Sequence, residues 1–307
     1  MEKNNFFTKG IVVFFFAMLC CALWGSATPF IKTGYELMMP DKDVPSTILF
    51  AGIRFFFAGV ITVLIYSIGR KKFLYPKKEN VGKVAVVSVF QTIIQYIFFY
   101  IGLANTTGVK GTVISGSNTF FSILIASLVF RQEKLTLRKI FACLLGFAGI
   151  LVVNLKGLDF NMNFLGDGFV LFSTVAYAIS SVLIKRFSKD EDPVVISGYQ
   201  FVLGGSVMIL LGLVLGGNVQ VDTLSAVLVL GYLAILSAVA YSVWGVLLKY
   251  NPVSKVTVYS FMIPVFGVLL SKLMLTEQSG VSATNLLIAL VLIACGIGVL
   301  NYSKKEK

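Results

Sequence analysis

Long apolar runs without charge constrain this chain more than any other feature of its sequence. A helix rises about 1.5 Å per residue, so a hydrocarbon core of about 30 Å takes about 20 mostly apolar residues to cross. Charged residues make up 13% of the chain, far below the roughly 25% of soluble domains, so we expect an all-α integral membrane protein. The ten candidate spans are Gly10–Ile31, Val44–Gly69 (containing Arg54), Val84–Val109, Gly111–Phe130, Ile140–Leu155, Gly168–Ile184, Pro193–Val221, Thr223–Leu248, Val256–Thr276 (containing Lys272) and Gln278–Ser303.

Three of these runs need a further argument. The fifth and sixth have only 16 and 17 uncharged residues, and they cross the membrane only if Lys139, Lys156 and Lys185 extend toward the lipid headgroups. The first resembles a secretory signal peptide, but its 22 uncharged residues exceed a typical signal core and no small-x-small cleavage site follows. We therefore expect ten transmembrane helices.

The distribution of Lys and Arg gives an independent test of that count. If the N-terminus is cytoplasmic and all ten runs span, 20 of the 26 basic residues lie on the cytoplasmic side. Five lie outside (Lys32, Lys42, Lys110, Lys156 and Lys272), and Arg54 lies within the membrane. This asymmetry predicts a multi-pass protein of the cell membrane, bacterial inner or cytoplasmic, with both termini in the cytoplasm. The net charge of +12 then reflects topology and contact with anionic membrane lipids, so no nucleic-acid partner is expected.

The chain offers little catalytic chemistry. It has no histidine, which removes His-based acid–base catalysis and the commonest metal ligand. All fourteen carboxylates fall at helix ends or in loops, the nearest to the membrane being those of Glu133, Asp167 and Glu277. We therefore expect no enzyme activity, no metal and no cofactor. A proton relay through an embedded acid is disfavoured too, which leaves facilitated diffusion or coupling through a carboxylate at a helix end.

The second half of the chain repeats the first. At an offset of 153, the segment that ends at Lys32 aligns with the segment that ends at Lys185, and Trp24 pairs with Tyr177. At 146, Gly52–Gly59 aligns with Gly198–Gly205, which pairs Arg54 with Gln200. Near 144 to 147, Tyr100 pairs with Trp244, Glu133 with Glu277, Gly149 with Gly296 and Asn154 with Asn301. The repeating unit is therefore five helices.

Five is an odd number, so the second unit must enter the membrane from the opposite side. Such inverted repeats can exchange two nearly equivalent conformations and so open a central site to each side in turn. The alternative is a duplicated bundle with no transport function.

The ten-helix count and several motifs resemble the EamA-type members of the drug/metabolite transporter superfamily. The motifs are Trp24-Gly25-Ser26 with Lys32 in helix 1, the R-F-x-x-A-G pattern from Arg54 to Gly59, and the acidic residues Glu133 and Glu277 after helices 4 and 9. The resemblance implies one EamA repeat over residues 10–155 and a second over 165–302. It also implies secondary transport of small metabolites, often amino-acid or drug export, through a central cavity lined mainly by helices 1, 3, 4, 6, 8 and 9. Two departures stand out: Phe120 replaces the usual proline of helix 4, whereas Pro264 remains in helix 9, and Gln200 replaces the helix-2 arginine in the second repeat.

Aromatic and amide side chains fall where that cavity is expected. In helix 3, Gln91 and Gln95 share one helical stripe, with Tyr96 and Tyr100 on the adjoining stripe. Polar groups in a bilayer should face the protein interior, and aromatic rings with hydrogen-bonding tips suit a neutral or zwitterionic organic solute. Some of these rings are expected to serve packing or the interfacial belt instead. The candidate substrate-binding residues are Trp24, Gln95, Tyr96, Tyr100, Asn118, Tyr177, Tyr241, Trp244 and Tyr259.

Three residues inside spans are unusual for a bilayer. Arg54 lies about 12 Å deep, where a cation costs about 2.5 kcal/mol or more unless it is paired or hydrated. It could neutralise a substrate carboxylate, act in a gate, or bond structurally to carbonyl groups of neighbouring helices. Pro29 and Pro264 each remove a backbone hydrogen bond, and either could be a hinge or a passive kink.

Taken together, the sequence predicts a transporter, most simply an exporter of amino acids or similar small molecules by alternating access. A flippase for lipid or lipid-linked metabolites is the main alternative, with Arg54 meeting a phosphate. A membrane-embedded enzyme is less consistent with scattered single acids. Gly212 and Gly216 form a GxxxG motif that fits either intrachain packing or a dimer seam, so both a monomer and a homodimer remain open.

Overall fold

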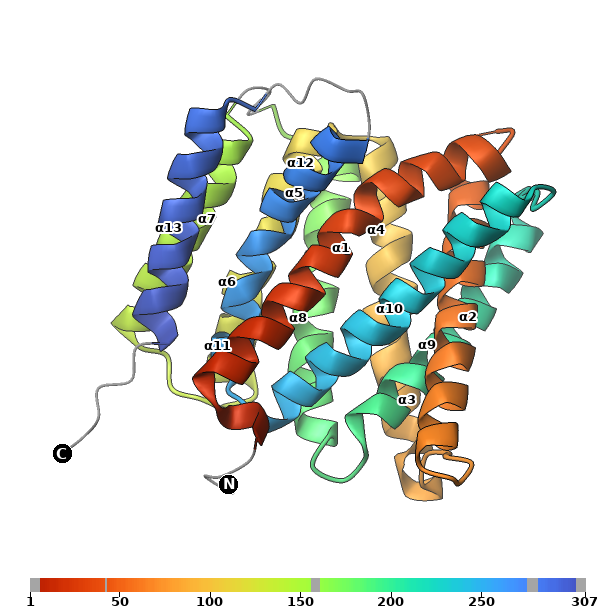
Figure 1. Ribbon diagram of the computed structural model, residues 1–307, viewed down its shortest axis with the longest axis horizontal. Coiled ribbons are helices and arrows are strands. Elements are labelled where there is room, and N and C mark those ends of the chain that lie inside the picture. Colours follow the sequence, from red (N-terminus) through yellow and green to blue (C-terminus); the bar gives the residue numbers. More distant parts are fainter. Residues whose placement is uncertain (1–5, 42, 156–160, 275–280, 302–307) are drawn as a thin grey trace.

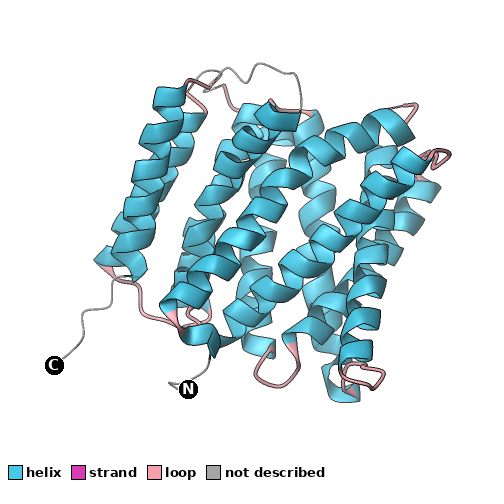
Figure 2. Ribbon diagram, viewed as in Figure 1, coloured by secondary structure: helices cyan, strands magenta, loops and turns pink. Residues whose placement is uncertain are grey.

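The computed structural model describes residues 6–41, 43–155, 161–274 and 281–301, and these residues form helices joined by short loops (Figures 1 and 2). No strand occurs among them. The helices lie roughly side by side, as expected when backbone N–H and C=O groups must be satisfied without water. The fold is therefore all-α, as predicted.

Several spans consist of more than one helical element. The elements of the first half are η1 (Phe6–Thr8), α1 (Gly10–Met38), α2 (Val44–Gly69), η2 (Lys78–Asn80), α3 (Val81–Ser88), η3 (Val89–Ile94), α4 (Gln95–Ala104), α5 (Gly108–Gly116), α6 (Asn118–Leu124), η4 (Ile125–Val129) and α7 (Leu137–Val153). Those of the second half are η5 (Phe164–Gly168), α8 (Phe169–Phe187), α9 (Pro193–Val214), α10 (Leu224–Tyr250), α11 (Val253–Thr257), η6 (Val258–Phe261), α12 (Met262–Met274) and α13 (Ala283–Asn301). The elements η3, η4 and η5 are π-helical, whereas η1, η2 and η6 are 3₁₀.

Nine helical segments in the described part of the chain are long and apolar enough to cross a membrane. The predicted span missing from these nine is the fifth, which corresponds to α7; this helix has 17 residues and begins at Leu137, so it takes in Arg138 and Lys139. In Figure 1, α7 runs beside α13, and α13 ends on the side where α1 begins. An even number of crossings would produce that arrangement, so the crossing by α7 stays a prediction that the packing supports.

The sixth predicted span is longer than its uncharged run. It extends from Phe164 to Phe187 because π-helix η5 precedes α8. Lys185 donates hydrogen bonds to the carbonyl oxygens of Leu248 and Asn251 at the end of α10. Its ammonium group therefore caps a neighbouring helix. The sequence had predicted that this group would extend toward the lipid headgroups instead.

Small residues bring α2 and α9 together in an antiparallel pair. A Cβ atom added to Gly59 would lie 2.6 Å from the Gly198 carbonyl oxygen, and one added to Gly205 would lie 2.9 Å from the Gly52 carbonyl oxygen. The repeat alignment pairs Gly52 with Gly198 and Gly59 with Gly205, so each contact is the counterpart of the other. Both backbones approach this closely because these positions lack side chains.

The pair α7 and α13 repeats the same arrangement. A Cβ atom on Gly149 would lie 3.0 Å from the Ala289 carbonyl oxygen, and one on Gly296 would lie 2.7 Å from the Ala142 carbonyl oxygen. At an offset of 147, Ala142 aligns with Ala289 and Gly149 with Gly296. The contacts are again reciprocal.

Other contacts between helices of the two halves also occur in related pairs. Helix α1 packs on α10 and α12, and its counterpart α8 packs on α4 and α6. Helix α2 also contacts α10, while α9 contacts α3. Each of these contacts between the halves therefore has a counterpart, which places helices of both halves around one centre.

We predict that Gly205→Ala destabilises the protein and that Gly298→Ala does not. The added Cβ atom of Gly205→Ala would meet the Phe56 backbone nitrogen at 2.4 Å, whereas nothing lies within 4 Å of the corresponding position at Gly298. Overpacking typically costs about 1–3 kcal/mol, which exceeds the roughly 1 kcal/mol gained by replacing glycine with alanine in a helix. Thermal unfolding in detergent should show a lower Tm for Gly205→Ala alone, and equal Tm values for both variants would contradict this packing.

We predict that α7 crosses the membrane. Alkaline phosphatase is active only outside the cytoplasm, so a fusion after Leu135 should be inactive and a fusion after Asn161 active. Equal activity of the two fusions would rule out a membrane crossing by α7.

Candidate functional site

The candidate residues from helices 1, 3 and 8 of the sequence come together at the centre of the bundle. Trp24 of α1 packs edge-to-face on Tyr241 and on Trp244 of α10, with ring centroids 5.1 Å and 5.0 Å apart. Tyr96 and Tyr100 of α4 lie 5.8 Å apart in the same group, and Tyr177 of α8 packs against it. The name aromatic cluster is used below for Trp24, Phe55, Tyr96, Tyr100, Tyr177, Phe201, Tyr241 and Trp244.

One hydrogen bond in the aromatic cluster joins the two halves of the chain directly. The hydroxyl groups of Tyr96 and Tyr241 lie 2.7 Å apart. Tyr241 is buried and Tyr96 half-buried, so the bond lies in a low-dielectric environment that strengthens it. It links α4 to α10 within the aromatic cluster.

Two phenylalanines that the sequence analysis did not single out complete the cluster. Phe55 of α2 and Phe201 of α9 are fully buried and stacked, with centroids 5.0 Å apart and planes 6° from parallel. The ring centroid of Phe55 also lies 4.4 Å from that of Tyr96, and the ring centroid of Phe201 lies 4.8 Å from that of Tyr241. The repeat alignment was the signal that could have found them, because the offset of 146 pairs Phe55 with Phe201.

Several polar atoms around the cluster are buried and have no hydrogen-bond partner among the described residues. They include the indole nitrogens of Trp24 and Trp244, which belong to the cluster, and the side-chain oxygens of Gln91 and Gln95, in the span that also carries Tyr96. Such groups are uncommon inside proteins, because each costs about 1–3 kcal/mol when unsatisfied. Donors and acceptors without partners beside a ring-lined centre are what a small organic solute requires.

Arg54 points into the same region. Its side chain is only 4% exposed, and its guanidinium carbon lies 4.3 Å from the centroid of the Phe55 ring. The Phe55 ring that it contacts lies 4.4 Å from the ring of Tyr96. Family resemblance placed helix 2 outside the cavity, yet this residue of helix 2 borders the aromatic cluster.

Gln200, which occupies the equivalent position in the second half, is bonded differently. Its side-chain oxygen accepts a hydrogen bond of 2.6 Å from Thr92, and its backbone carbonyl accepts one from Ser88. Both donors lie in the third span, at and next to π-helix η3. The two halves thus use this position in different ways.

Asn118 lies in a second polar group, where two interrupted helices meet, and Tyr259 directly precedes Ser260 of that group. Helix α5 ends at Gly116 and α6 begins at Asn118, while 3₁₀ helix η6 separates α11 from α12. Thr119 donates to the Thr257 carbonyl at 3.0 Å, and its hydroxyl lies 2.9 Å from that of Ser260. The structure thereby brings the fourth and ninth spans together at their breaks, a contact that sequence reasoning did not identify.

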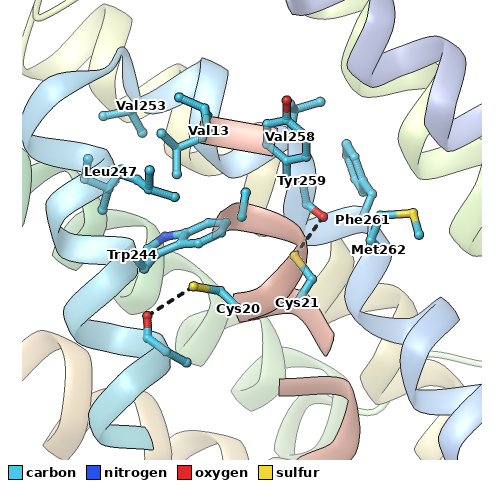
Figure 3. Packing of buried hydrophobic residues seen from close by; sticks show 14 of the residues in the cluster. Val13, Cys20, Cys21, Trp244, Leu247, Val253, Val258, Tyr259, Phe261 and Met262 are labelled. Carbon is cyan, nitrogen blue, oxygen red and sulfur yellow. Dashed lines mark hydrogen bonds between the residues drawn. The ribbon is translucent and has the colours of Figure 1, made fainter. Parts of the chain in front are cut away.

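Tyr259 joins this second group to the core of α1 and α10. Figure 3 shows its ring beside Val13 and Val258, and the Cys21 thiol donates to its carbonyl oxygen at 3.1 Å. Trp244 lies on the other side of the same cluster, near Cys20. Tyr259 is 3% exposed and packs in the same buried hydrophobic cluster as Trp244.

The two prolines occupy different local settings. Pro29 lies inside a continuous α1, one turn beyond Gly25, where α12 approaches most closely: a Cβ atom on Gly25 would lie 2.8 Å from the Gly267 nitrogen. Pro264 lies in the first turn of α12, directly after η6. There the missing N–H costs little, because the first turn of a helix has no intrahelical acceptor for it.

A pocket of about 540 Å³ lies away from the aromatic cluster, at the loop ends of η2 and α8. It is lined by Lys77, Glu79, Asn80, Lys83, Lys189 and Asp190. Lys83 donates to Asp190 at 2.5 Å, and this hydrogen bond holds the pKa of the Asp190 carboxyl below its usual range. None of the predicted substrate-binding residues lines this pocket.

The comparison with protein families decides what kind of protein carries this architecture. The profile of the EamA-like transporter family matches residues 11–155 and again residues 164–302. The chain belongs to the EamA-like transporter family. The resemblance seen in the motifs is thereby confirmed, and with it a multi-pass membrane protein with a transport function.

Similar EamA-like proteins occur in archaea, bacteria and plants. An "uncharacterized transporter" of Archaeoglobus fulgidus is 26% identical over 265 residues, covering 84% of this chain and 88% of the relative. The transporter YvbV of Bacillus subtilis is 24% identical over 300 residues, covering 93% and 90%. A WAT1-related chloroplast protein of Arabidopsis thaliana is 26% identical over 268 residues, covering 81% and 63%. A solved crystal structure with 18% identity superposes with a TM-score of 0.77 over 94% of this chain and 96% of that one, which shows a shared fold.

We predict that the Tyr96–Tyr241 hydrogen bond stabilises the contact between the two halves. Tyr96→Phe and Tyr241→Phe should each lower the free energy of unfolding by about 0.5–1.5 kcal/mol, because each leaves one buried hydroxyl without its partner. The double variant should be no less stable than either single variant, since both hydroxyls are then gone. Unfolding in detergent measures all three values, and additive losses would contradict a direct bond.

Proposed function

We propose that this EamA-like protein is a secondary transporter that exports small amphiphilic metabolites such as amino acids, with the aromatic cluster as the substrate-binding site. The observation that carries the proposal is the convergence of rings from both halves on one centre that holds unpartnered polar atoms. Aromatic rings can enclose an apolar side chain, while indole N–H groups and amide oxygens match the carboxylate and ammonium of an amino acid.

The proposed mechanism is alternating access between two inverted five-helix repeats, residues 10–155 and 165–302. Antiparallel pairing with reciprocal contacts, Gly59 on Gly198 and Gly205 on Gly52, supports a pseudo-two-fold axis that lies in the membrane plane. The exchange of neighbours between α1 and α8 supports the same axis. Two halves with equivalent contacts can exchange conformations at a small cost in free energy.

Polar contacts at the two ends of the bundle support this mechanism. At one end, Lys110 of α5 donates to the Asn161 carbonyl; at the other, Lys255 of α11 donates to the Thr8 carbonyl at 3.5 Å. Offsets of 145 and 153 relate Lys110 to Lys255 and Thr8 to Asn161, so these contacts are counterparts. Opening toward one side of the membrane would break one contact and keep the other.

The contact at Lys110 includes a buried acid, Asp167, whereas the acid beside Lys255 is Glu133, which accepts hydrogen bonds from Ser254. Asp167 of η5 is 1% exposed, accepts a hydrogen bond from Thr106, and lies 3.6 Å from the Lys110 ammonium. The position related by an offset of 153 is Phe14. We propose Asp167 as the helix-end carboxylate that couples solute transport to an ion.

The cellular setting follows the same reasoning. We propose residence in the cytoplasmic membrane with both termini inside, as the distribution of Lys and Arg predicts. No cofactor and no enzymatic step is part of the proposed mechanism. Gly212 of the GxxxG motif packs on Leu49 of α2, where an added Cβ would lie 2.7 Å from the Leu49 Cβ. This contact favours an intrachain role for Gly212, so a dimer is not required.

We predict that Trp24→Ala abolishes transport and Phe15→Ala does not. Both substitutions shorten an aromatic side chain of α1, but Trp24 packs in the aromatic cluster, whereas Phe15 is 63% exposed on the outer face of the bundle. The measurement is uptake of a mixed radiolabelled amino-acid pool by proteoliposomes, with empty vesicles as background. Saturable uptake lost only in Trp24→Ala supports the proposal; no uptake above background by the wild-type protein would refute amino acids as its substrates.

A further inference from the structure

We propose that Arg54 is the residue that binds the substrate carboxylate, so that the site selects amphiphilic solutes carrying a carboxylate next to an apolar group. This inference rests on the proposed function, because it assigns a substrate class to the same aromatic cluster. It concerns a residue of α2, a helix that the family resemblance did not place around the cavity.

The first argument is the state of the guanidinium group. Arg54 is 4% exposed, and its Nε and one of its terminal nitrogens have no hydrogen-bond partner within the described residues. A cation at this depth costs about 2.5 kcal/mol or more, and the cost falls when an anion or hydrogen-bond acceptors surround it. A structural arginine would therefore be expected to bond to carbonyl groups of neighbouring helices with these nitrogens.

The second argument is the absence of an internal counter-charge. The ion pairs found in the described part of the chain join Lys83 to Asp190, Lys110 to Asp167 and Lys139 to Glu133. All six residues lie at the ends of the bundle or in its loops, away from Arg54. Arg54 takes part in none of these ion pairs, so the described residues offer no carboxylate within 4.0 Å of its guanidinium.

The third argument is the set of groups next to Arg54. Phe55 offers its ring to the guanidinium, and the same ring lies 4.4 Å from that of Tyr96, whose hydroxyl is 2.7 Å from the Tyr241 hydroxyl. Tyrosine hydroxyls can donate to a carboxylate that is bound by the arginine fork. Tyr241 also contacts Trp24, so the apolar part of such a solute would reach the rings of the aromatic cluster.

The comparison of the two halves supports a role specific to Arg54. Its counterpart Gln200 carries no charge: Thr92 holds its side-chain oxygen and Ser88 its backbone carbonyl, while its amide nitrogen has no partner among the described residues. If this position served only to hold helices together, the amide would suffice in both halves. A positive charge on α2 without a counterpart on α9 makes the site electrostatically asymmetric. A zwitterionic solute would then bind with its carboxylate toward α2.

The intrinsic fluorescence of the protein offers a direct binding assay, because its only two tryptophans, Trp24 and Trp244, both lie in the aromatic cluster. We would titrate the purified protein with phenylalanine, 3-phenylpropionate, phenylalaninamide and phenethylamine, exciting at 295 nm, where these probes do not absorb. The first two carry a carboxylate and the last two do not. The ratio of their dissociation constants measures recognition of the carboxylate, which a merely structural residue would not change.

We expect the wild-type protein to bind the two acids at least tenfold more tightly than the two probes without a carboxylate. Arg54→Gln should weaken acid binding by about 10- to 100-fold, the range for a charge-assisted hydrogen bond, and leave the other two probes unchanged. Arg54→Lys should retain part of the preference, because it keeps the charge but loses the planar fork. Lys32→Gln, which removes an exposed charge from the end of α1, is the matched control and should behave like the wild-type protein.

Two results would overturn the assignment while leaving the proposed function intact. The first is equal binding of phenylalanine and phenylalaninamide by the wild-type protein. The second is an unchanged preference of Arg54→Gln for the probes that carry a carboxylate. In both cases amino-acid uptake would still depend on Trp24. If Arg54→Gln fails to fold, the wild-type preference and Arg54→Lys decide the question. Quenching by short-chain phosphatidylglycerol but by none of the four probes would overturn both proposals in favour of a lipid phosphate.

Discussion

Close antiparallel packing of helices at glycine is the interaction on which the rest of this structure depends. In a bilayer, apolar side chains gain little by leaving lipid for protein, so association relies on van der Waals contact and on buried polar bonds. Gly59 and Gly205 let α2 and α9 approach until a single added carbon would overlap the opposite backbone. This contact places Phe55 on Phe201 and so builds one side of the aromatic cluster. Gly149 and Gly296 join α7 to α13 in the same way.

The centre of the bundle combines rigid and adjustable features. The rings of the cluster are packed on one another, yet several indole and amide groups there lack partners in the described structure. The helices that surround this centre are interrupted: η3 is a π-helix in the third span, and the fourth and ninth spans break next to Thr119 and Ser260. Such irregularities are tolerated in membranes where the backbone is buried in protein, and they often mark functional positions. A transporter needs both features, since it must hold a solute and also let its helices move.

Much of this arrangement was predictable because the sequence contains its own alignment. Pairing Gly52 with Gly198 and Gly59 with Gly205 identified residues that meet across α2 and α9, although the alignment alone did not say that they touch. Trp24, Tyr96 and Tyr241 were predicted as site residues from aromatic character and helical position, and the structure brings them together. Asn118 and Tyr259 were predicted for the same site, but Asn118 lies in a second group with Ser260, and Tyr259 directly precedes that serine. Side chains on different helices share no sequence spacing, so their partners could not be deduced from periodicity.

The sequence by itself determined that the chain is helical and embedded in a membrane, because the length and apolar character of its runs leave no other way to satisfy the backbone. It also determined the family and its two matching halves, which depend on residue identities in order. Only the tertiary structure decided that Arg54 borders the aromatic cluster and that Lys185 caps α10. The physical reason is that the direction of a side chain depends on helix rotation and on π-helical or 3₁₀ register, and these are set by packing between helices far apart in the chain.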